Sequence, residues 1–375
     1  MDLICHYSPI MGLIIDTQKP AFGLDISDVS MKAMLLQKKK SEVSPRAWAD
    51  LKIPPGVIEN DVIKDKKFLV QSIKNLIQNT KGGLIKTKRV IASVPESKSF
   101  VRIINLPPME DEEIKEAISW EVEEHIPVDI ENVYLDWQKI EVGKKPKSAW
   151  LEGKENINQT KILVVATPKK IIDDLAEVLK KADLIPQILE IESAAATRAL
   201  IPKEDFGPYL IIDIDAYRTS FIIINKQILQ LTTSIPIAGN AFTDAIARRL
   251  GIDDQEAEQL KRKHGLDKKK KRGRIHQALA PSLSNLTEEV NRLIKFYQEY
   301  FPVKNKISKV ILCGGSAKLP GIASCLTHTL KLDVKLGNPW ANIYKTKGRI
   351  PPISYKNSLS YTTAIGLALR GIVNK

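Results

Sequence analysis

The chain has 375 residues, of which 43% are hydrophobic, and 57 Lys and Arg against 44 Asp and Glu give it a formal net charge of +13. This length allows two or more domains with real cores. The charge favours an acidic partner such as nucleic acid, a phosphorylated ligand or an anionic membrane, although a lysine-rich surface is the simpler explanation. The three cysteines form no disulfide framework, no apolar run reaches the roughly 18 residues of a membrane helix, and residues 1–15 lack the basic region of a secretory signal.

The first half of the chain has the apolar periodicity of a mixed α/β protein. Two strands are predicted at 21–27 and 30–37, joined by a short turn, and an amphipathic helix follows over 65–83, where Gly82 and Gly83 end it. The next predicted elements are, in chain order, strands at 89–95 and 100–108, a helix at 110–127, a strand at 132–140, a polar hairpin loop at 144–160, a strand at 161–168, a helix at 169–184, and a strand that continues into a helix at 187–200.

A break in composition at 201–208 separates the two halves, and the pattern then starts again. The stretches "GLDISDVSMKAMLLQ" (23–37) and "IIDIDAYRTSFIIIN" (211–225) each contain an apolar strand, an Asp-Ile pair, a polar turn and a second apolar strand, so that Asp25 overlies Asp213. Such hairpins also arise by chance, but two similar halves predict two related α/β domains with a ligand between them. The predicted elements of the second half are three strands over 209–237, helices at 240–251, 254–265 and 280–301, a strand, glycine turn and helix over 308–330, and a closing helix at 361–371.

The two matched aspartates predict a phosphate and metal site. Tight turns expose backbone N–H groups that bind anions, and an adjacent carboxylate can hold Mg²⁺, usually through water. Asp213 and Asp215 lie two apart in a predicted buried strand, so both face one side, where two carboxylates are costly unless a ligand uses them. Taken singly, Asp25 or Asp213 is better explained as an ordinary turn residue; the matched pair, together with the glycine turn that follows, favours the site.

A glycine turn is predicted within "VILCGGSAKLPGI", residues 310–322. An apolar strand ends there at Gly314 and Gly315, and a helix begins near Leu319 and Pro320. Glycines let the backbone approach a nucleotide base or ribose. A plain strand–helix turn is the alternative.

The order of these features resembles the actin-like ATPase superfamily: a strand–Asp hairpin, an inserted segment, a second strand–Asp hairpin and then "CGGSAKLPG". Within it the chain is most similar to the PilM family of type IV pilus assembly proteins, relatives of the division protein FtsA. The similarity extends from about residue 19 to the C-terminus. Its most specific part is 102–200, with "RIINLPPMEDEEIKEAISWEVEEHIPVDIENVYLDWQ" and "ILVVATPKKIIDDLAEVLKKADLIPQILEIESAAATRAL", because generic actin-like proteins lack this segment.

The resemblance implies an α/β, actin-like (ribonuclease H-like) two-domain fold with a small α/β subdomain inserted in the first domain. The implied organisation is an N-terminal extension at 1–18, a first actin-like domain at 19–88 and 340–375, an inserted subdomain at 89–188, a connecting segment at 189–205, and a second actin-like domain at 206–339 that includes a basic loop at 261–274.

The resemblance also implies ATP and Mg²⁺ between the domains. The residues it assigns to the nucleotide are Asp25 and Ser27 in the first phosphate turn, Asp213, Asp215 and Thr219 in the second, and Gly314 and Gly315 in the adenosine turn. Asp25 and Asp213 are the implied metal-side acids, with Glu192 as a weaker candidate.

Two departures from the family pattern concern these phosphate turns. The family has Asp-Ile-Gly in both turns, whereas this chain has Ser27 and Asp215 at the glycine positions. At 4 Å and an effective dielectric constant near 20, two like charges repel by roughly 4 kcal/mol, so Asp215 is expected to weaken triphosphate binding unless a metal uses it. ATP binding is therefore expected, and efficient hydrolysis is not.

The implied partner is a PilN-like inner-membrane protein, whose N-terminal cytoplasmic tail binds in a groove beside the inserted subdomain and links the chain to the pilus assembly complex. The residues lining that groove are not identified by the sequence. The expected location is cytoplasmic, peripheral at the inner membrane through this partner. Residues 261–274 carry nine Lys or Arg and could contact an anionic membrane, although a solvated loop is the simpler interpretation. They contain no Phe, Tyr or Trp on which bases could stack, and nucleic acid is not expected.

Two alternatives belong to the same fold class. An active ATPase or sugar kinase would need a catalytic base, and the sequence offers no candidate. An FtsA-like division protein would carry an amphipathic membrane helix after its last domain, whereas this chain ends at "LALRGIVNK".

Overall fold

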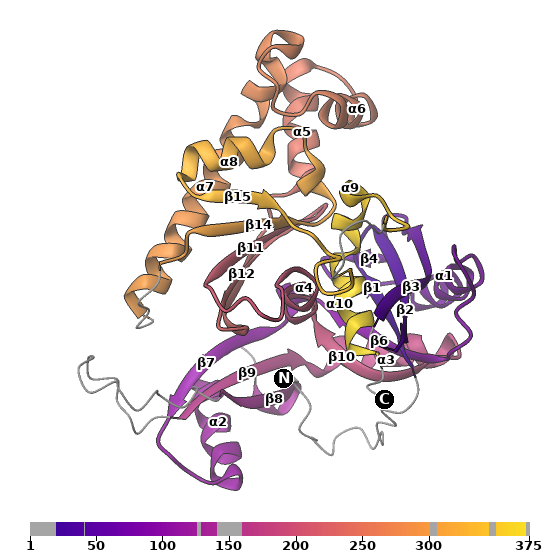
Figure 1. The fold of residues 1–375 in the computed structure, drawn as a ribbon, viewed down its shortest axis with the longest axis vertical. Coiled ribbons are helices and arrows are strands. Elements are labelled where there is room, and N and C mark those ends of the chain that lie inside the picture. Colours follow the sequence, from indigo (N-terminus) through magenta and orange to yellow (C-terminus); the bar gives the residue numbers. More distant parts are fainter. Residues whose placement is uncertain are drawn as a thin grey trace.

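The computed structural model describes residues 20–40, 42–125, 129–140, 160–300, 306–344 and 350–372. The predicted extension at 1–18 and nearly all of the predicted loop at 144–160 lie outside them. Figure 1 shows two sheets that each carry helices, with a third, smaller sheet below the second.

The first sheet has five strands in the order β10-β6-β1-β2-β3. β1, β2 and β3 form an antiparallel meander, whereas β1, β6 and β10 run parallel. The bounds are β1 Phe22–Ile26, β2 Ser30–Lys39, β3 Glu42–Lys52, β6 Arg89–Val94 and β10 Ile185–Ile191, with a small hairpin of β4 Ile58–Glu59 and β5 Val62–Ile63 beside the sheet.

The second sheet repeats this arrangement in the order β13-β12-β11-β14-β15. Here β11, β12 and β13 are antiparallel, and β11, β14 and β15 are parallel. The bounds are β11 Tyr209–Ile214, β12 Thr219–Asn225, β13 Ile228–Ile235, β14 Lys309–Cys313 and β15 Asp333–Leu336. The shared strand order and directions confirm the predicted repeat and the predicted fold class.

Helices cover both sheets with apolar faces. In the first domain α1 and α3 pack on the strands through Leu69, Ile73 and Val178. α4 and α10 approach each other so closely that a Cβ on Gly366 would lie 1.8 Å from the Ala195 carbonyl oxygen. The helix bounds are α1 Lys66–Gln78, α2 Asp111–His125, α3 Lys169–Lys181, α4 Glu192–Leu200, α5 Gly239–Leu250, α6 Asp254–His264, α7 Arg274–Tyr300, α8 Ile322–Leu330, α9 Tyr355–Ser358 and α10 Thr362–Arg370.

The third sheet belongs to an insert that is smaller than predicted. It contains β7 Phe100–Leu106, β9 Thr160–Pro168 and β8 Val133–Ile140 in the order β7-β9-β8, with α2 packed against it. β6, α3 and the first residues of β10, which the prediction placed in the insert at 89–188, instead pack in the first domain. The parallel pairing of β6 with β10 brings together strands from both sides of the insert, which local pattern does not reveal.

Two further elements differ from the prediction. β3 was not predicted, because Pro45 interrupts its pattern; the structure accommodates this proline in an edge strand, at a register shift between Leu35 and Leu36 of β2. α7 begins at Arg274 rather than at 280, since Ile275 and Leu279 are buried in the core.

The basic run at 261–274 is not a single solvated loop. Its first residues end α6, and residues 270–273 form a 3-10 turn. Lys261 is buried, donates to the Gly239 carbonyl oxygen at 2.6 Å and pairs with Glu258 at 2.5 Å, so it joins α6 to α5. Within the described ranges, no helix has the length and hydropathy needed to cross a membrane.

A buried ion cluster joins the C-terminal helix to the first sheet. The Glu190 side chain on β10 has no exposed surface and pairs with Arg198 of α4 at 2.6 Å and with Arg370 of α10. Arg198 also donates to the Gly366 carbonyl oxygen at 3.0 Å. Burial by itself raises the pKa of Glu190, but the two guanidiniums outweigh it and the pKa is lowered. The ionised carboxylate therefore stabilises the fold.

We predict that Glu190→Gln lowers the free energy of unfolding by about 3 kcal/mol, because it removes the negative charge that two largely buried cations share. Since the folded-state pKa of Glu190 is lowered, this difference should persist above roughly pH 4.3 and shrink as the pH falls further. The matched control is Asp183→Asn, which removes an exposed pair with Lys88 and should cost less than about 1 kcal/mol. If urea unfolding shows the same loss of unfolding free energy for both variants, the buried ion cluster does not stabilise the fold as proposed.

Candidate functional site

The two predicted phosphate turns are closed by equivalent backbone hydrogen bonds. The Ser27 N–H donates to the Ser30 carbonyl oxygen at 2.9 Å, and the Asp215 N–H donates to the Arg218 carbonyl oxygen at 3.0 Å. These are the same positions in the overlaid stretches, so Ser27 and Asp215 are structural equivalents. The repeat in the sequence thus extends to the geometry of the turns.

Asp25 and Asp213 each occupy the next-to-last position of a central strand, and both are nearly buried, at 8% and 9% exposure. Burial raises the pKa of Asp25 and raises that of Asp213 well above its usual value, and neighbouring aspartates add to both shifts. Asp25 accepts a hydrogen bond from the Ser93 hydroxyl at 3.1 Å. The Oδ1 atom of Asp213, by contrast, is buried and has no hydrogen-bond partner among the residues that the structure describes.

Asp215 differs from the prediction, because β11 ends at Ile214 and leaves it exposed in the turn. Its Oδ1 accepts a hydrogen bond from the Gly315 N–H at 3.2 Å. Its backbone oxygen accepts from the Ser316 hydroxyl at 2.7 Å. The side chain therefore joins the second phosphate turn to the glycine turn and gives an anionic partner to a backbone N–H of that turn.

Gly314 has a positive φ of +88° and packs tightly against Asp213. A Cβ at this position would lie 2.3 Å from the Asp213 Oδ1 atom and 2.5 Å from the Ile214 carbonyl oxygen. Gly315 has φ −64°, and a Cβ added there would have the Asp215 Oδ1 as its nearest neighbour, at 4.0 Å. The first glycine is thus required by the turn, and the second is not.

An ion pair connects the two domains beside these turns. Arg218, in the second phosphate turn, pairs with Asp61 of the first domain at 3.0 Å. The Ser97 hydroxyl also donates to Asp61, and the Asp61 N–H donates to Asp28 at 2.9 Å. The Arg218 guanidinium therefore offsets part of the negative charge of Asp61 and Asp28.

Glu192 belongs to the same group of acids. Its pKa is raised well above the usual value by burial and then by the charges of Asp25 and Asp61. Its Oε2 accepts from the Glu96 N–H at 3.1 Å, and Glu96 in turn accepts from the Ser193 N–H at 3.2 Å. We define the carboxylate junction as Asp25, Glu192 and Asp213, whose pKa values are raised here, together with Asp61 and Asp215, whose charges contribute to those shifts.

The structure brings most predicted site residues to this junction, but not all. Thr219 is buried and donates to the Ile237 carbonyl oxygen at 2.6 Å, so its hydroxyl is engaged within the second domain. Sequence reasoning missed Asp61, Glu96 and Arg218, whose roles depend on contacts between distant segments. Lys32 was also missed. Its charge counteracts part of the burial effect that raises the pKa of Asp25, and its register opposite Asp25 in the β1–β2 hairpin is the signal that could have found it.

The junction fits a divalent cation only in part. The unpartnered Oδ1 of Asp213 supplies an anionic oxygen in a protected position. However, no group of three His, Cys, Asp or Glu side chains in the described part of the chain could hold a metal ion. Phosphate oxygens or water would have to provide the remaining ligands, as is usual for Mg²⁺.

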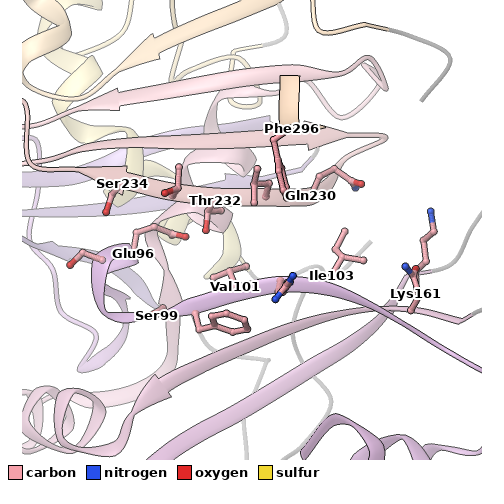
Figure 2. A pocket seen from close by; sticks show the side chains of 15 residues that line it. Glu96, Ser99, Val101, Ile103, Lys161, Gln230, Thr232, Ser234 and Phe296 are labelled. Carbon is pink, nitrogen blue, oxygen red and sulfur yellow. The ribbon is translucent and has the colours of Figure 1, made fainter. Parts of the chain in front are cut away.

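A second feature is a cavity of about 590 Å³ between β7 of the insert and β13 of the second sheet, which we call the edge groove. Both strands are the outermost strands of their sheets. Consecutive residues of each strand line the cavity, over 99–103 and 230–234. Since alternate side chains of a strand point to opposite faces, this pattern means that the cavity runs along the strand edges. Figure 2 shows the two edges facing each other, with Thr232 and Val101 between them.

The duplicated sheets, the inserted subdomain and the paired turns define an actin-like protein. The family model of the type IV pilus assembly protein PilM matches residues 23–372, and the chain belongs to this family. A solved structure of a PilM-PilN type IV pilus biogenesis complex contains a similar chain, with a TM-score of 0.77 and 28% identity over 96% of this chain and 100% of that one. These findings confirm the resemblance that the sequence motifs indicated.

More distant relatives share the fold. The cell division protein FtsA of Escherichia coli K12 is 23% identical over 235 residues, which is 56% of this chain and 54% of the relative, so this chain spans about half the length of that protein. FtsA of Enterococcus hirae is 22% identical over 356 residues, 84% of this chain and 78% of its own. MreB5 of Spiroplasma citri bound to ADP has a TM-score of 0.52 at 16% identity, over 93% of this chain and 95% of that one.

We predict that Gly314→Ala lowers the free energy of unfolding by about 1–3 kcal/mol, because the methyl group meets Asp213 and the backbone is left-handed. The matched control is Gly315→Ala, which meets no close atom and should change stability by less than about 0.5 kcal/mol. Thermal unfolding followed by circular dichroism checks both. Equal stability of the two variants would show that the turn does not need its first glycine.

Proposed function

We propose that this chain is a scaffold of type IV pilus assembly that recruits the N-terminal cytoplasmic tail of a PilN-like inner-membrane protein. The observation that carries the proposal is the edge groove, where two strand edges that pair with no other strand in the described part of the chain border one cavity. Extended peptides commonly bind by adding a strand to such an edge, because the main chain supplies the hydrogen bonds. The similar chain in a solved PilM-PilN complex supports the choice of partner.

In this proposal the protein acts in the cytoplasm and is held at the inner membrane by its partner. The basic residues near the start of α7, which include the exposed Lys268 and Lys269, would lie close to anionic lipid headgroups. The match to FtsA proteins is at lower identity and, in E. coli, over about half of the relative, so pilus assembly is favoured over cell division.

We also propose that ATP with Mg²⁺ binds at the carboxylate junction. Two turns with equivalent hydrogen bonds meet there, and the Asp213 oxygen without a partner is a suitable acid for the metal side. Asp215 opposes this binding, because it places a negative charge beside the turns and occupies the N–H of Gly315. The proposed role of the nucleotide is therefore structural, with slow or absent hydrolysis.

Asp215→Gly should raise the affinity for Mg²⁺–ATP about two- to fivefold, since an exposed charge contributes up to about 1 kcal/mol. Asp215→Asn removes the charge but keeps a hydrogen-bond acceptor, so the two variants separate charge from side-chain bulk. Isothermal titration calorimetry measures both. If either substitution weakens binding instead, Asp215 serves as a metal ligand and the site has been rebuilt around it.

Thr232→Trp should fill the edge groove and reduce binding of the PilN-like tail peptide at least tenfold without loss of thermal stability. The matched control is Lys335→Trp, at an exposed position on β15, the opposite edge of the same sheet. Fluorescence anisotropy with a labelled synthetic tail checks the prediction. Full affinity in the Thr232 variant would place the peptide elsewhere.

A further inference from the structure

The edge groove has opposite charges at its two ends. Glu96 lies at one end, near Ser234, and Lys161 lies at the other, beyond Ile103, as Figure 2 shows. The exposed cation Arg102 also lines the groove.

The carboxyl group of Glu96 is buried and only partly satisfied. The residue is 5% exposed; its Oε2 accepts from the Ser193 N–H at 3.2 Å, whereas its Oε1 has no hydrogen-bond partner within the described residues. Burial raises the pKa of Glu96, and the side chains of Thr232, on the opposite wall, and Ser193 counteract part of that effect. A buried acceptor without a donor costs about 1–3 kcal/mol, so this end of the groove is suited to a hydrogen-bond donor.

The surroundings of Glu96 strengthen its preference for a cation. Glu192 accepts the hydrogen bond of the Glu96 backbone N–H, and Asp61 accepts that of the adjacent Ser97 hydroxyl. Arg218 pairs with Asp61 and is engaged there. The acids therefore outnumber the cations at this end.

The two ends also differ in exposure. Glu96 is buried, whereas Arg102 and Asn105, toward the other end, are exposed. A chain terminus fits a buried end, and a chain that continues into a larger protein must leave through the exposed end.

We infer that the strand bound in the edge groove has its terminal ammonium at Glu96 and continues outward past Arg102 and Lys161. This inference rests on the proposed function, because it takes the bound segment to be the N-terminal tail of the partner. Glu96 is then the residue that selects a free chain terminus.

This direction has a consequence for strand pairing. From the Glu96 end to the Lys161 end, β7 runs from Ser99 toward Ile103, whereas β13 runs the opposite way, from Gln230 to Ser234 (Figure 2). A strand that enters with its amino end at Glu96 is therefore antiparallel to β13 and parallel to β7, and antiparallel pairing is the slightly more stable kind. The acid at the Glu96 end and antiparallel pairing with β13, the longer of the two edge strands, therefore favour the same direction of the bound strand.

The first test is a thermodynamic cycle. A synthetic tail peptide of the PilN-like protein is prepared with a free and with an acetylated amino terminus, and both are titrated against the wild-type chain and Glu96→Gln. The glutamine keeps a carbonyl oxygen for the Ser193 N–H. Acetylation should weaken binding to the wild type about tenfold and change binding to the variant by less than about twofold, since a hydrogen bond to a charged group is lost only in the first case. Equal effects of acetylation on both proteins would overturn the role of Glu96.

The second test determines in which direction the bound peptide runs along the edge groove, and it leaves Glu96 unchanged. A single cysteine is placed at the first or the last residue of the peptide, and disulfide formation is compared for Ser234→Cys and Gln230→Cys, with the wild-type chain as the background. The first position should couple faster to the Ser234 variant and the last position to the Gln230 variant. The reverse preference would overturn the direction and leave the proposed function intact. If the tail peptide binds neither the wild-type chain nor the cysteine variants, the proposed function and this inference are both contradicted.

Discussion

The structure depends on the burial of carboxylates where two copies of the same hairpin meet. Asp25 and Asp213 lie at the ends of the two central strands, and each is nearly buried beside other acids. Charges of one sign in such a position repel and lose hydration, so the fold must offset them. The ion pair of Arg218 with Asp61 offsets part of this cost by placing a cation across the domain boundary. The same constraint makes a phosphate–metal complex a natural complement to the junction, because the metal can bridge the two sets of oxygens.

The carboxylate junction and the edge groove share one short segment. In residues 96–98, the Glu96 backbone contacts Glu192 and the Ser97 hydroxyl contacts Asp61, while the Glu96 side chain lines the groove. Both proposed ligands would therefore act on the same turn. The insert also packs against the second sheet, through Val101 and Leu163.

Much of the fold could be predicted from the sequence, because the repeated strand–Asp hairpin is local. The overlay of Asp25 on Asp213 identified matching strands. The two turns that follow these strands are closed by equivalent backbone hydrogen bonds. The limits of the insert could not be predicted, since the parallel pairing of β6 and β10 depends on strands separated by the insert itself. β3 was missed because a proline at a bulge conceals its alternation. The partners of Arg218 and Glu96, and the edge groove, arise only when separate domains pack, and no sequence motif records them.

The central claim is that the partner's tail binds as an added strand between β7 and β13. Hydrogen–deuterium exchange of the full chain with and without the tail peptide tests this most directly, because added strand hydrogen bonds slow the exchange of the backbone amides at the edges. The account predicts slower exchange in residues 100–106 and 228–235, with β15 at the far edge of the second sheet unchanged. Protection that appears elsewhere while both edge strands exchange at their original rates would contradict it.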